Sequence, residues 1–148
     1  MRAVLQRVAR AAVTVDEKRV AAIDGGLCIL LGVGAGDTER DAEWLAEKIA
    51  HLRIFEDREG KMNLSLWDVR GSALVVSQFT LYGDCRKGRR PSFLDAASAE
   101  EGNRLYQYFM EQMKRHGVDT SCGIFQTHMT VEIANDGPVT LVLDTRRK

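Results

Sequence analysis

The sequence predicts an α+β fold, with a largely antiparallel, curved sheet or partial barrel and two main helices packed on it. Two observations lead to this expectation. Short β-rich runs are spread along the whole chain, whereas only two segments show the spacing of apolar residues that an amphipathic helix requires. The regular alternation of strands and helices that is typical of a doubly wound sheet is missing. Because no linker or internal repeat divides the chain, we expect residues 1–148 to form a single domain.

The first strands are expected near the N-terminus. Residues 3–8 and residues 12–15 are β-rich. The charged residues 16–19 then predict a turn into residues 20–23, which completes a hairpin. The run at residues 27–33 is apolar without alternation, which indicates a strand buried on both of its faces.

Two segments have the marks of helices. The first begins near residues 37–38 and has an apolar stripe made of Ala42, Leu45, Ala46, Ile49 and Leu52. The second begins at Ser98, because Ser98 and Glu101 have the spacing of a capping box, in which each side chain bonds a free backbone N–H of the first turn. Gly117 is a natural C-terminal stop for this helix. Its apolar face consists of Leu105, Tyr106, Phe109, Met110 and Met113.

Further strands are expected in the middle and at the end of the chain. Residues 73–76 predict a second buried strand, which runs directly into Ser77-Gln78-Phe79-Thr80. Three β-rich segments follow at residues 120–125, 129–133 and 139–143. Between the last two, residues 135–138 are typical of a turn that joins two strands, because Gly137 tolerates unusual backbone angles and Pro138 fixes φ.

The composition is that of a globular protein without strong overall charge. The 148 residues include 21 basic and 21 acidic side chains, so any contact with nucleic acid must come from a local patch. No apolar stretch approaches the roughly 18 residues of a membrane span, so no membrane partner is expected. The three cysteines form no CxxC pair, and Cys28 lies in an apolar run. These features predict a core position for Cys28 and a cytoplasmic location for the protein.

No standard catalytic constellation is visible. His51 and His116 lie on the two predicted helices and are interpreted as structural. His128 follows a predicted strand and can reach a pocket, which leaves open a small-molecule hydrolase with a triad around it, although no GxSxG motif is present. Residues 32–36 read GxGxG and not the GxGxxG of a dinucleotide site, and the ligand spacing of a metal site is missing. We therefore expect no cofactor and no metal.

A basic cluster, Arg86-Lys87-Gly88-Arg89-Arg90, contrasts with the neutral composition. Four cations in five residues can neutralise phosphates and position a nucleic-acid backbone without reading its sequence. A solvated charged loop is the plain alternative, and a non-enzymatic RNA-binding module is another. The cluster closely follows residues 77–82, which favours a role beside that segment.

Several segments together resemble the D-aminoacyl-tRNA deacylase family, of the bacterial and eukaryotic type first described as D-tyrosyl-tRNA deacylases. The family motif SQxT is complete at residues 77–80, and the motif NxGPxT is complete at residues 135–140. The resemblance covers essentially the whole chain and includes residues 1–8, 52–57 and 88–93. It implies hydrolysis of the ester bond of D-aminoacyl-tRNA, and of mischarged glycyl-tRNA, with release of free tRNA and amino acid. This activity is a chiral proofreading step in translation.

The resemblance also implies a homodimer with active sites at the subunit interface, where SQxT of one subunit meets the Gly-Pro motif of the other. In such proteins the bond between Gly137 and Pro138 is cis. Main-chain carbonyls around it orient the α-amino group of the substrate, and the main chain rejects an L side chain sterically. Backbone N–H groups around Phe79 and Thr80 are expected to hold the ester carbonyl as negative charge develops. The alternative is that Thr80 acts as a nucleophile through its hydroxyl, for which no base is visible.

The resemblance implies three groups of site residues. The catalytic segment consists of Ser77, Gln78, Phe79 and Thr80. Substrate binding and L-rejection are expected of Asn135, Gly137, Pro138, Thr140, Phe125 and Met129, of which Phe125 and Met129 line the pocket of the terminal adenosine. The phosphates at the tRNA 3′ acceptor end are expected to contact Arg86, Lys87, Arg89 and Arg90.

Overall fold

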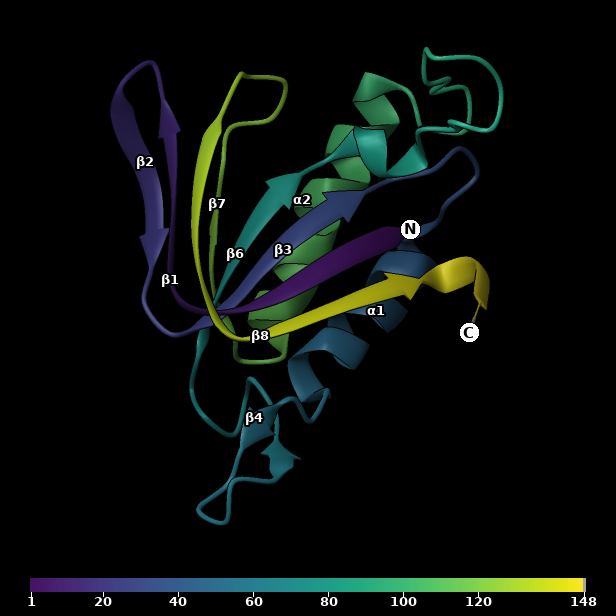
Figure 1. Ribbon diagram of the computed structural model, residues 1–148. Helices are drawn as coiled ribbons and strands as arrows, with labels where there is room; N and C mark the ends of the chain where they lie inside the picture. Colours follow the sequence, from purple (N-terminus) through teal and green to yellow (C-terminus); the bar gives the residue numbers. More distant parts are fainter. Residues whose placement is uncertain (148) are drawn as a thin grey trace.

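The chain is organised around one long strand, β1 (Arg2–Val15), which pairs with three other strands (Figure 1). The computed structural model describes residues 1–147, so Lys148, the last residue of the expected domain, lies outside the described residues. The other strands are β2 (Lys18–Ile23), β3 (Gly26–Gly32), β4 (Phe55–Glu56), β5 (Met62–Leu64), β6 (Ser72–Ser77), β7 (Asp119–Cys122) and β8 (Thr130–Asp144). The helices are α1 (Glu39–His51), α2 (Ala99–Arg115) and two 3₁₀ helices, η1 (Phe79–Tyr82) and η2 (Thr145–Arg147).

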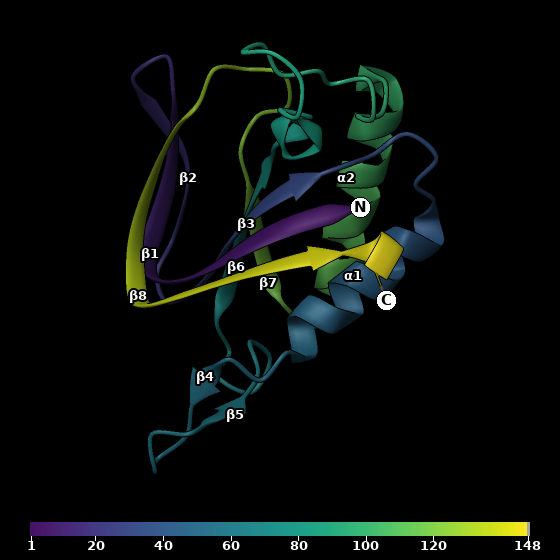
Figure 2. The same ribbon diagram turned by 45° about the vertical axis from the view of Figure 1, so that its right-hand side comes forward.

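The bend of β1 curls the main sheet. The first half of β1 pairs with β3 and the second half with β2, while β8 runs antiparallel along both halves. The pairs β3–β6 and β6–β7 are parallel, so three of the five pairings in this sheet are antiparallel and two are parallel. Figure 2 shows the resulting curvature, with β1 and β8 turning together away from the helices. The predicted α+β fold with a curved, partly barrel-shaped sheet is confirmed.

Both helices cover the same face of the sheet. The helix α1 lies between β3 and β6 in the chain, and α2 lies between β6 and β7, so each helix belongs to a crossover between parallel strands. Their predicted apolar stripes are buried, except that Leu52 is half-buried just beyond the end of α1. The core between helices and sheet includes Leu5, Ile29, Leu45, Ile49, Val75, Leu105 and Phe109. The amphipathic pattern thus placed the helices correctly, although it did not reveal the crossovers.

The two helices begin with different caps. At α2, the Ser98 hydroxyl accepts the N–H of Glu101 at 3.3 Å, as predicted. The Glu101 carboxylate does not bond the backbone N–H of Ser98, and instead its two oxygens share the Nε–H of Arg104. At α1, the Asp41 carboxylate accepts both the N–H and the hydroxyl of Thr38. Side-chain bonds of this kind stabilise a helix by about 1 kcal/mol.

A second apolar cluster lies where the sheet curls over. Cys28 is fully buried there, which confirms the predicted core position, and burial raises the pKa of its thiol to about 11. The thiol therefore stays neutral at physiological pH and packs as a small apolar side chain. Its neighbours in this cluster are Val8, Ala11, Val13, Val15, Ile23, Leu74 and Val76.

The predicted turn at residues 135–138 is wrong, because β8 runs through this segment without reversing direction. Gln6 pairs with Thr140 and Val8 pairs with Asn135, so residues 136–139 lie opposite Arg7 alone. This bulge accommodates Pro138, which has no N–H to donate to the sheet. Gly137 has φ of 123°, in the region that favours glycine, and the peptide bond to Pro138 is cis.

A buried ion pair ties η1 to the N-terminus of β1 and to the loop after β3. The Met1 ammonium lies 2.9 Å from Oδ2 of Asp37. The same oxygen accepts the N–H of Gly34 at 2.6 Å and the hydroxyl of Tyr82 at 3.2 Å. Asp37 also lies 3.9 Å from Nη2 of Arg146, whereas the buried Met1 ammonium has Asp37 as its ion-pair partner and depends on it for compensation.

The Asp37→Asn variant should lower the free energy of unfolding by about 3 kcal/mol or more, because it leaves the Met1 ammonium without an opposing buried charge. The midpoint of urea unfolding measures this loss. Asp16→Asn is the matched control, because Asp16 lies exposed in the β1–β2 turn, and its effect should stay within about 0.5 kcal/mol. Equal midpoints for the two variants would contradict the role given to the ion pair.

Candidate active site

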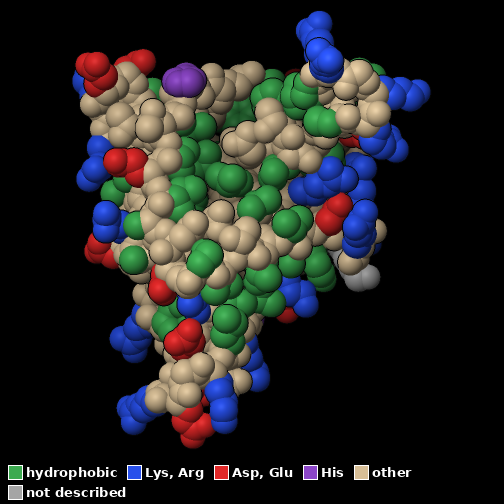
Figure 3. All heavy atoms as spheres, in the orientation of Figure 1, with side chains coloured by type: hydrophobic (Ala, Val, Ile, Leu, Met, Phe, Trp, Pro, Cys, Tyr) green, Lys and Arg blue, Asp and Glu red, His purple; other side chains and the backbone are tan. Residues whose placement is uncertain are grey.

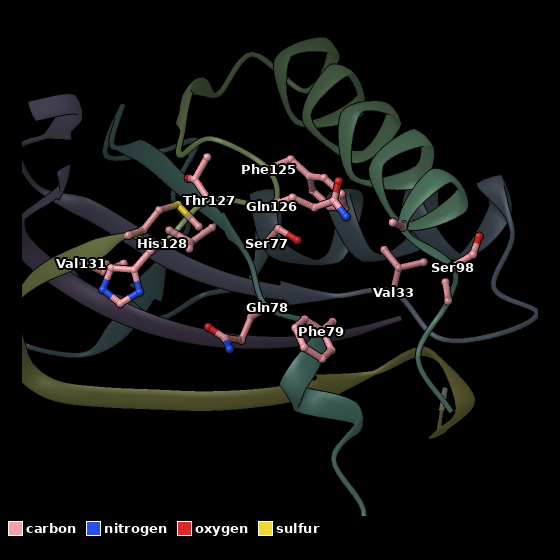
Figure 4. Close-up of a pocket in the computed structure, with 15 residues that line it drawn as sticks. Val33, Ser77, Gln78, Phe79, Ser98, Phe125, Gln126, Thr127, His128 and Val131 are labelled. Atoms are coloured by element: carbon pink, nitrogen blue, oxygen red, sulfur yellow. The ribbon is translucent and has the colours of Figure 1, made fainter. Parts of the chain in front are cut away.

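A pocket of about 460 Å³ opens between the end of β6, the start of α2 and the loop that follows β7. Figure 4 shows Ser77 in its middle, Phe79 and Ser98 on one side, and His128 on the other. Parallel strands end together at this edge of the sheet, which is where pockets form in sheets of this kind. The pocket therefore brings Ser77, Gln78 and Phe79 of the predicted catalytic segment together with the predicted adenosine-binding residues, whereas Thr80 is not among the lining residues.

The catalytic segment is the point where a strand becomes a helix. Ser77 ends β6, and the N–H of Gln78 donates to the carbonyl of Leu31 at 2.8 Å, which fixes the segment against β3. The tight 3₁₀ turn of η1 follows, and its first two N–H groups belong to Phe79 and Thr80. Neither finds an acceptor within residues 1–147, as expected at a helix start. These two donors are available to a bound ligand.

The Thr80 side chain is exposed, and its hydroxyl accepts a hydrogen bond from Nε2 of Gln78. No carboxylate, histidine or lysine within residues 1–147 is hydrogen-bonded to this hydroxyl. A nucleophilic hydroxyl needs a base placed to remove its proton. The geometry therefore favours a main-chain role for Thr80 over a side-chain role.

The opposite wall of the pocket is built on an aromatic pair. The Phe125 ring lies 5.9 Å from the Tyr106 ring, between centroids, and the Tyr106 hydroxyl donates to the buried carbonyl of Val75 at 2.8 Å. Phe125 and Met129 both line the pocket, as the resemblance implied. Sequence reasoning missed Gly102 of α2, which lines the same wall, because a glycine inside a helical pattern carries no signal of its own.

A catalytic triad around His128 is not assembled. His128 and Ser77 both line the pocket, but no hydrogen bond joins them in the part of the chain that the structure describes. The lining contains no aspartate or glutamate that would orient the imidazole. His51 and His116 lie elsewhere, with their rings in an edge-to-face contact at 5.5 Å between the two helices.

The Gly-Pro motif lies outside this pocket. Asn135, Gly137, Pro138 and Thr140 are exposed on β8, and none of them is among the lining residues. The Thr140 hydroxyl donates to Oε1 of Gln6 on the neighbouring strand. A single chain therefore does not bring its Gly-Pro motif together with its SQxT motif.

Arg7 holds the Gly-Pro segment in place. Its side chain is only 6% exposed, and its Nε donates to the carbonyl of Asp136 at 3.1 Å. Its Nη1 donates to the carbonyl of Ile54 at 2.8 Å, and Nη2 lies 3.6 Å from Oε1 of Glu56. Sequence reasoning missed this residue. The available signal was its position, because Arg7 follows Ala3 and Leu5 on the inward face of a strand, where an arginine needs a specific partner.

The basic cluster lies on a closed loop beside η1. Two backbone hydrogen bonds between Asp84 and Ser92 close this loop. Arg86 donates to the Asp84 carboxylate, and these bonds lower the pKa of Asp84 to about 2, so the pair stays ionised at neutral pH. Lys87, Arg89 and Arg90 have no ion pair with any of residues 1–147. In Figure 3, basic side chains gather over this loop at the upper right.

Residues 4–144 match the D-Tyr-tRNA(Tyr) deacylase family. The chain belongs to this family. A D-aminoacyl-tRNA deacylase of Caldicellulosiruptor saccharolyticus is 60% identical over 147 residues, which is 99% of each chain. A D-aminoacyl-tRNA deacylase of Geobacter sulfurreducens is 59% identical over 148 residues, which is 100% of this chain and 97% of the relative. The resemblance stated from the two motifs is thus confirmed.

Two solved structures have the same fold as this chain. One, described as c-Myc DNA Unwinding Element Binding Protein, has 42% identity and a TM-score of 0.91, and the match covers 97% of this chain and 98% of the other. Another, described as a probable eukaryotic D-amino acid tRNA deacylase, has a TM-score of 0.82 over 96% and 97% of the two chains. At 20% identity the second match supports the fold alone.

Two further properties of residues 1–147 bear on the site. None of their helices is long and apolar enough to cross a membrane. No group of three or more His, Cys, Asp and Glu side chains among them is placed to hold a metal ion.

The Arg7→Met variant should lower the free energy of unfolding by about 2–4 kcal/mol, because it leaves the carbonyls of Ile54 and Asp136 without their donor. Hydrogen exchange measured on peptides that cover residues 135–140 should become faster. Arg10→Met, at an exposed position on the same strand, is the matched control and should change neither quantity. Unchanged exchange in the Arg7 variant would show that this side chain does not hold the segment.

Proposed function

We propose that this protein hydrolyses the ester bond between a D-amino acid and the 3′ end of tRNA, and that it acts likewise on mischarged glycyl-tRNA. The products are free tRNA and free amino acid, so the reaction removes D-residues before translation uses them. Membership of the family supports the substrate class, since the relatives are named D-aminoacyl-tRNA deacylases. A single structural observation carries the mechanism, namely two free backbone N–H groups, one on Phe79 in the wall of a pocket and one on Thr80, the next residue along the chain.

The N–H groups of Phe79 and Thr80 are proposed to bind the ester carbonyl oxygen. Water attacks the carbonyl carbon, and the oxygen becomes negatively charged as the tetrahedral intermediate forms. Two fixed donors stabilise that charge more than they stabilise the neutral carbonyl, which lowers the barrier. The bond to the ribose oxygen then breaks, and that oxygen takes up a proton. We propose that the neighbouring hydroxyl of the terminal ribose orients the attacking water.

The selectivity for D-residues is assigned to Gly137 and Pro138 of a second copy of the chain. These residues are exposed on β8 and lie outside the pocket of their own chain, so they are free to meet the pocket of another. Their carbonyls would orient the α-amino group, and the main chain would leave no room for an L side chain. Even a methyl group on Gly137 would meet Val139 at 3.1 Å and Arg7 at 3.2 Å, so this segment has little freedom to adapt.

The outer face of the sheet supports a homodimer with sites at its interface. Val142 of β8 is 71% exposed and pairs with Val4, which in turn pairs with Leu30 of β3. Cross-strand partners point to the same face, so these side chains form one apolar row. Figure 3 looks onto this face and shows apolar side chains spread over its middle. A second copy that covers this row would bury it and bring each Gly-Pro motif near the other pocket.

The tRNA is proposed to place its terminal adenosine against Phe125 and Met129, which line the apolar part of the pocket. Its phosphates would contact the basic loop, where Arg86, Lys87, Arg89 and Arg90 are all exposed. Such contacts hold the backbone without reading bases. Because tRNA is aminoacylated and used in the cytoplasm, we propose that the protein acts there.

Incubation of the purified protein with D-tyrosyl-tRNA, L-tyrosyl-tRNA and glycyl-tRNA tests the proposal. We expect loss of the D-tyrosyl and glycyl esters only, because both fit a site that excludes an L side chain. Binding of all three without turnover would instead indicate an RNA-binding module. Hydrolysis of simple esters that is abolished by His128→Ala would indicate a small-molecule hydrolase.

The Thr80→Ala variant should retain most of its activity on D-tyrosyl-tRNA, because alanine keeps the backbone N–H. Its loss in kcat should stay far below the about 100-fold or more that follows removal of an oxyanion donor. Single-turnover rates and circular dichroism separate chemistry from folding. Complete loss of turnover in a folded variant that still binds substrate would support the nucleophile alternative.

A further inference from the structure

An exposed aromatic pair connects the pocket with the basic loop. Phe79 lines the pocket and is 55% exposed, and its ring meets that of Phe93 edge to face at 5.1 Å between centroids. Phe93 follows directly after the backbone bonds that close the basic loop, and it is 38% exposed. The next residue, Leu94, is 90% exposed. These three side chains, which we call the aromatic step, present apolar surface to solvent.

The aromatic step is held on a fixed backbone. A side chain at Gly83 would meet the Phe93 ring at 3.0 Å, so the ring lies directly on the main chain that follows η1. The carbonyl of Phe93 accepts the N–H of Ala96, and the carbonyl of Asp95 accepts the N–H of Ala35 at 2.9 Å. The exposed ring is therefore anchored on both sides, which lowers the entropy that a ligand would lose on stacking against it.

The unpaired positive charges near the aromatic step favour a nucleic-acid ligand over a protein partner. Lys87, Arg89 and Arg90 are exposed and have no ion pair with any of residues 1–147, whereas Arg86 is compensated by Asp84. A fixed aromatic ring beside uncompensated cations is the usual arrangement for an unpaired nucleic-acid strand, in which bases stack on rings and phosphates meet cations. A protein partner would need an acidic surface with an apolar centre, and nothing in the structure calls for one.

We propose that the aromatic step stacks the base of the nucleotide that precedes the terminal nucleoside of the tRNA. In this arrangement the pocket holds the last nucleoside, Phe93 supports the base before it, and the basic loop holds the phosphates. This inference rests on the proposed function, because it assumes that the pocket receives the 3′ end of an RNA. It assigns a substrate-positioning role to Phe93, which does not touch the reacting ester.

The test compares two substrates, D-tyrosyl-tRNA and the minimal ester 2′(3′)-O-D-tyrosyl-adenosine, which has no preceding nucleotide. Stacking of one base on a ring contributes about tenfold or more to affinity, so Phe93→Ala should lower the ratio of the two kcat/KM values by about this factor. Phe93→Trp should preserve the ratio. Trp67→Ala, which removes an exposed aromatic side chain that is not part of the pocket lining, is the matched control and should leave the ratio unchanged.

Two outcomes with these esters overturn the inference. An unchanged ratio in Phe93→Ala means that no base stacks there, whether or not a protein partner uses the surface. An equal loss on both esters means that Phe93 only supports Phe79. If the wild-type protein hydrolyses neither ester, the proposed function has failed. The aromatic step is then judged by binding of a short single-stranded RNA with 2-aminopurine in the penultimate position, whose fluorescence Phe93 should quench and Phe93→Ala should not.

The role of the cations has its own readout. Each phosphate contact to a single strand contributes about 0.7 to the slope of log affinity against log salt concentration. Arg90→Ala should reduce the slope of log kcat/KM for D-tyrosyl-tRNA by about this amount. Arg58→Ala removes an exposed cation from the β4–β5 hairpin, at the opposite end of the molecule in Figure 1, and should leave the slope unchanged. An equal effect of the two variants would overturn the placement of the phosphates.

Discussion

The hydrogen bonds of the buried Arg7 guanidinium fix the Gly-Pro segment, on which the proposed selectivity depends. The guanidinium joins three segments, because it extends from β1 to the carbonyl of Ile54 after α1 and to the carbonyl of Asp136 on β8. Without these bonds, the bulge at residues 136–139 would lose the contact that fixes its position. A buried arginine is stable only where carbonyls or carboxylates surround it, so the position of the bulge and the charge of Arg7 support each other.

The sheet places the two functional segments in different regions of one chain. The parallel strands β3, β6 and β7 end together at the pocket, where η1 leaves two N–H groups free. The long antiparallel pair β1–β8 carries the Gly-Pro bulge on an exposed face, next to the apolar row that includes Val142. The proposed catalysis and the proposed selectivity therefore both depend on the main chain. A complete site would therefore combine the pocket of one copy with the Gly-Pro bulge of a second copy.

The sequence predicted the elements whose pattern is local. The apolar stripes of α1 and α2, the buried strands and the Ser98 cap all follow from spacing along the chain. Residues 135–138 were interpreted as a turn, because Gly and Pro favour turns locally, whereas the long pairing with β1 kept this segment within a strand. Arg7 was missed because its partners lie 47 and 129 residues away in the chain. The two motifs pointed to the site only through the family resemblance, since backbone donors leave no side-chain signature.

Subunit complementation tests most directly whether each site combines Phe79 and Thr80 of one chain with Gly137 and Pro138 of another. Phe79→Pro removes one proposed N–H donor, and Gly137→Val fills the proposed selectivity wall, so each variant alone should be inactive on D-tyrosyl-tRNA. A mixed dimer would contain one site with both changes and one site with neither. An equimolar mixture, exchanged through mild denaturant, should therefore recover about a quarter of the wild-type activity. No recovery in a mixture shown to contain mixed dimers would contradict the shared site.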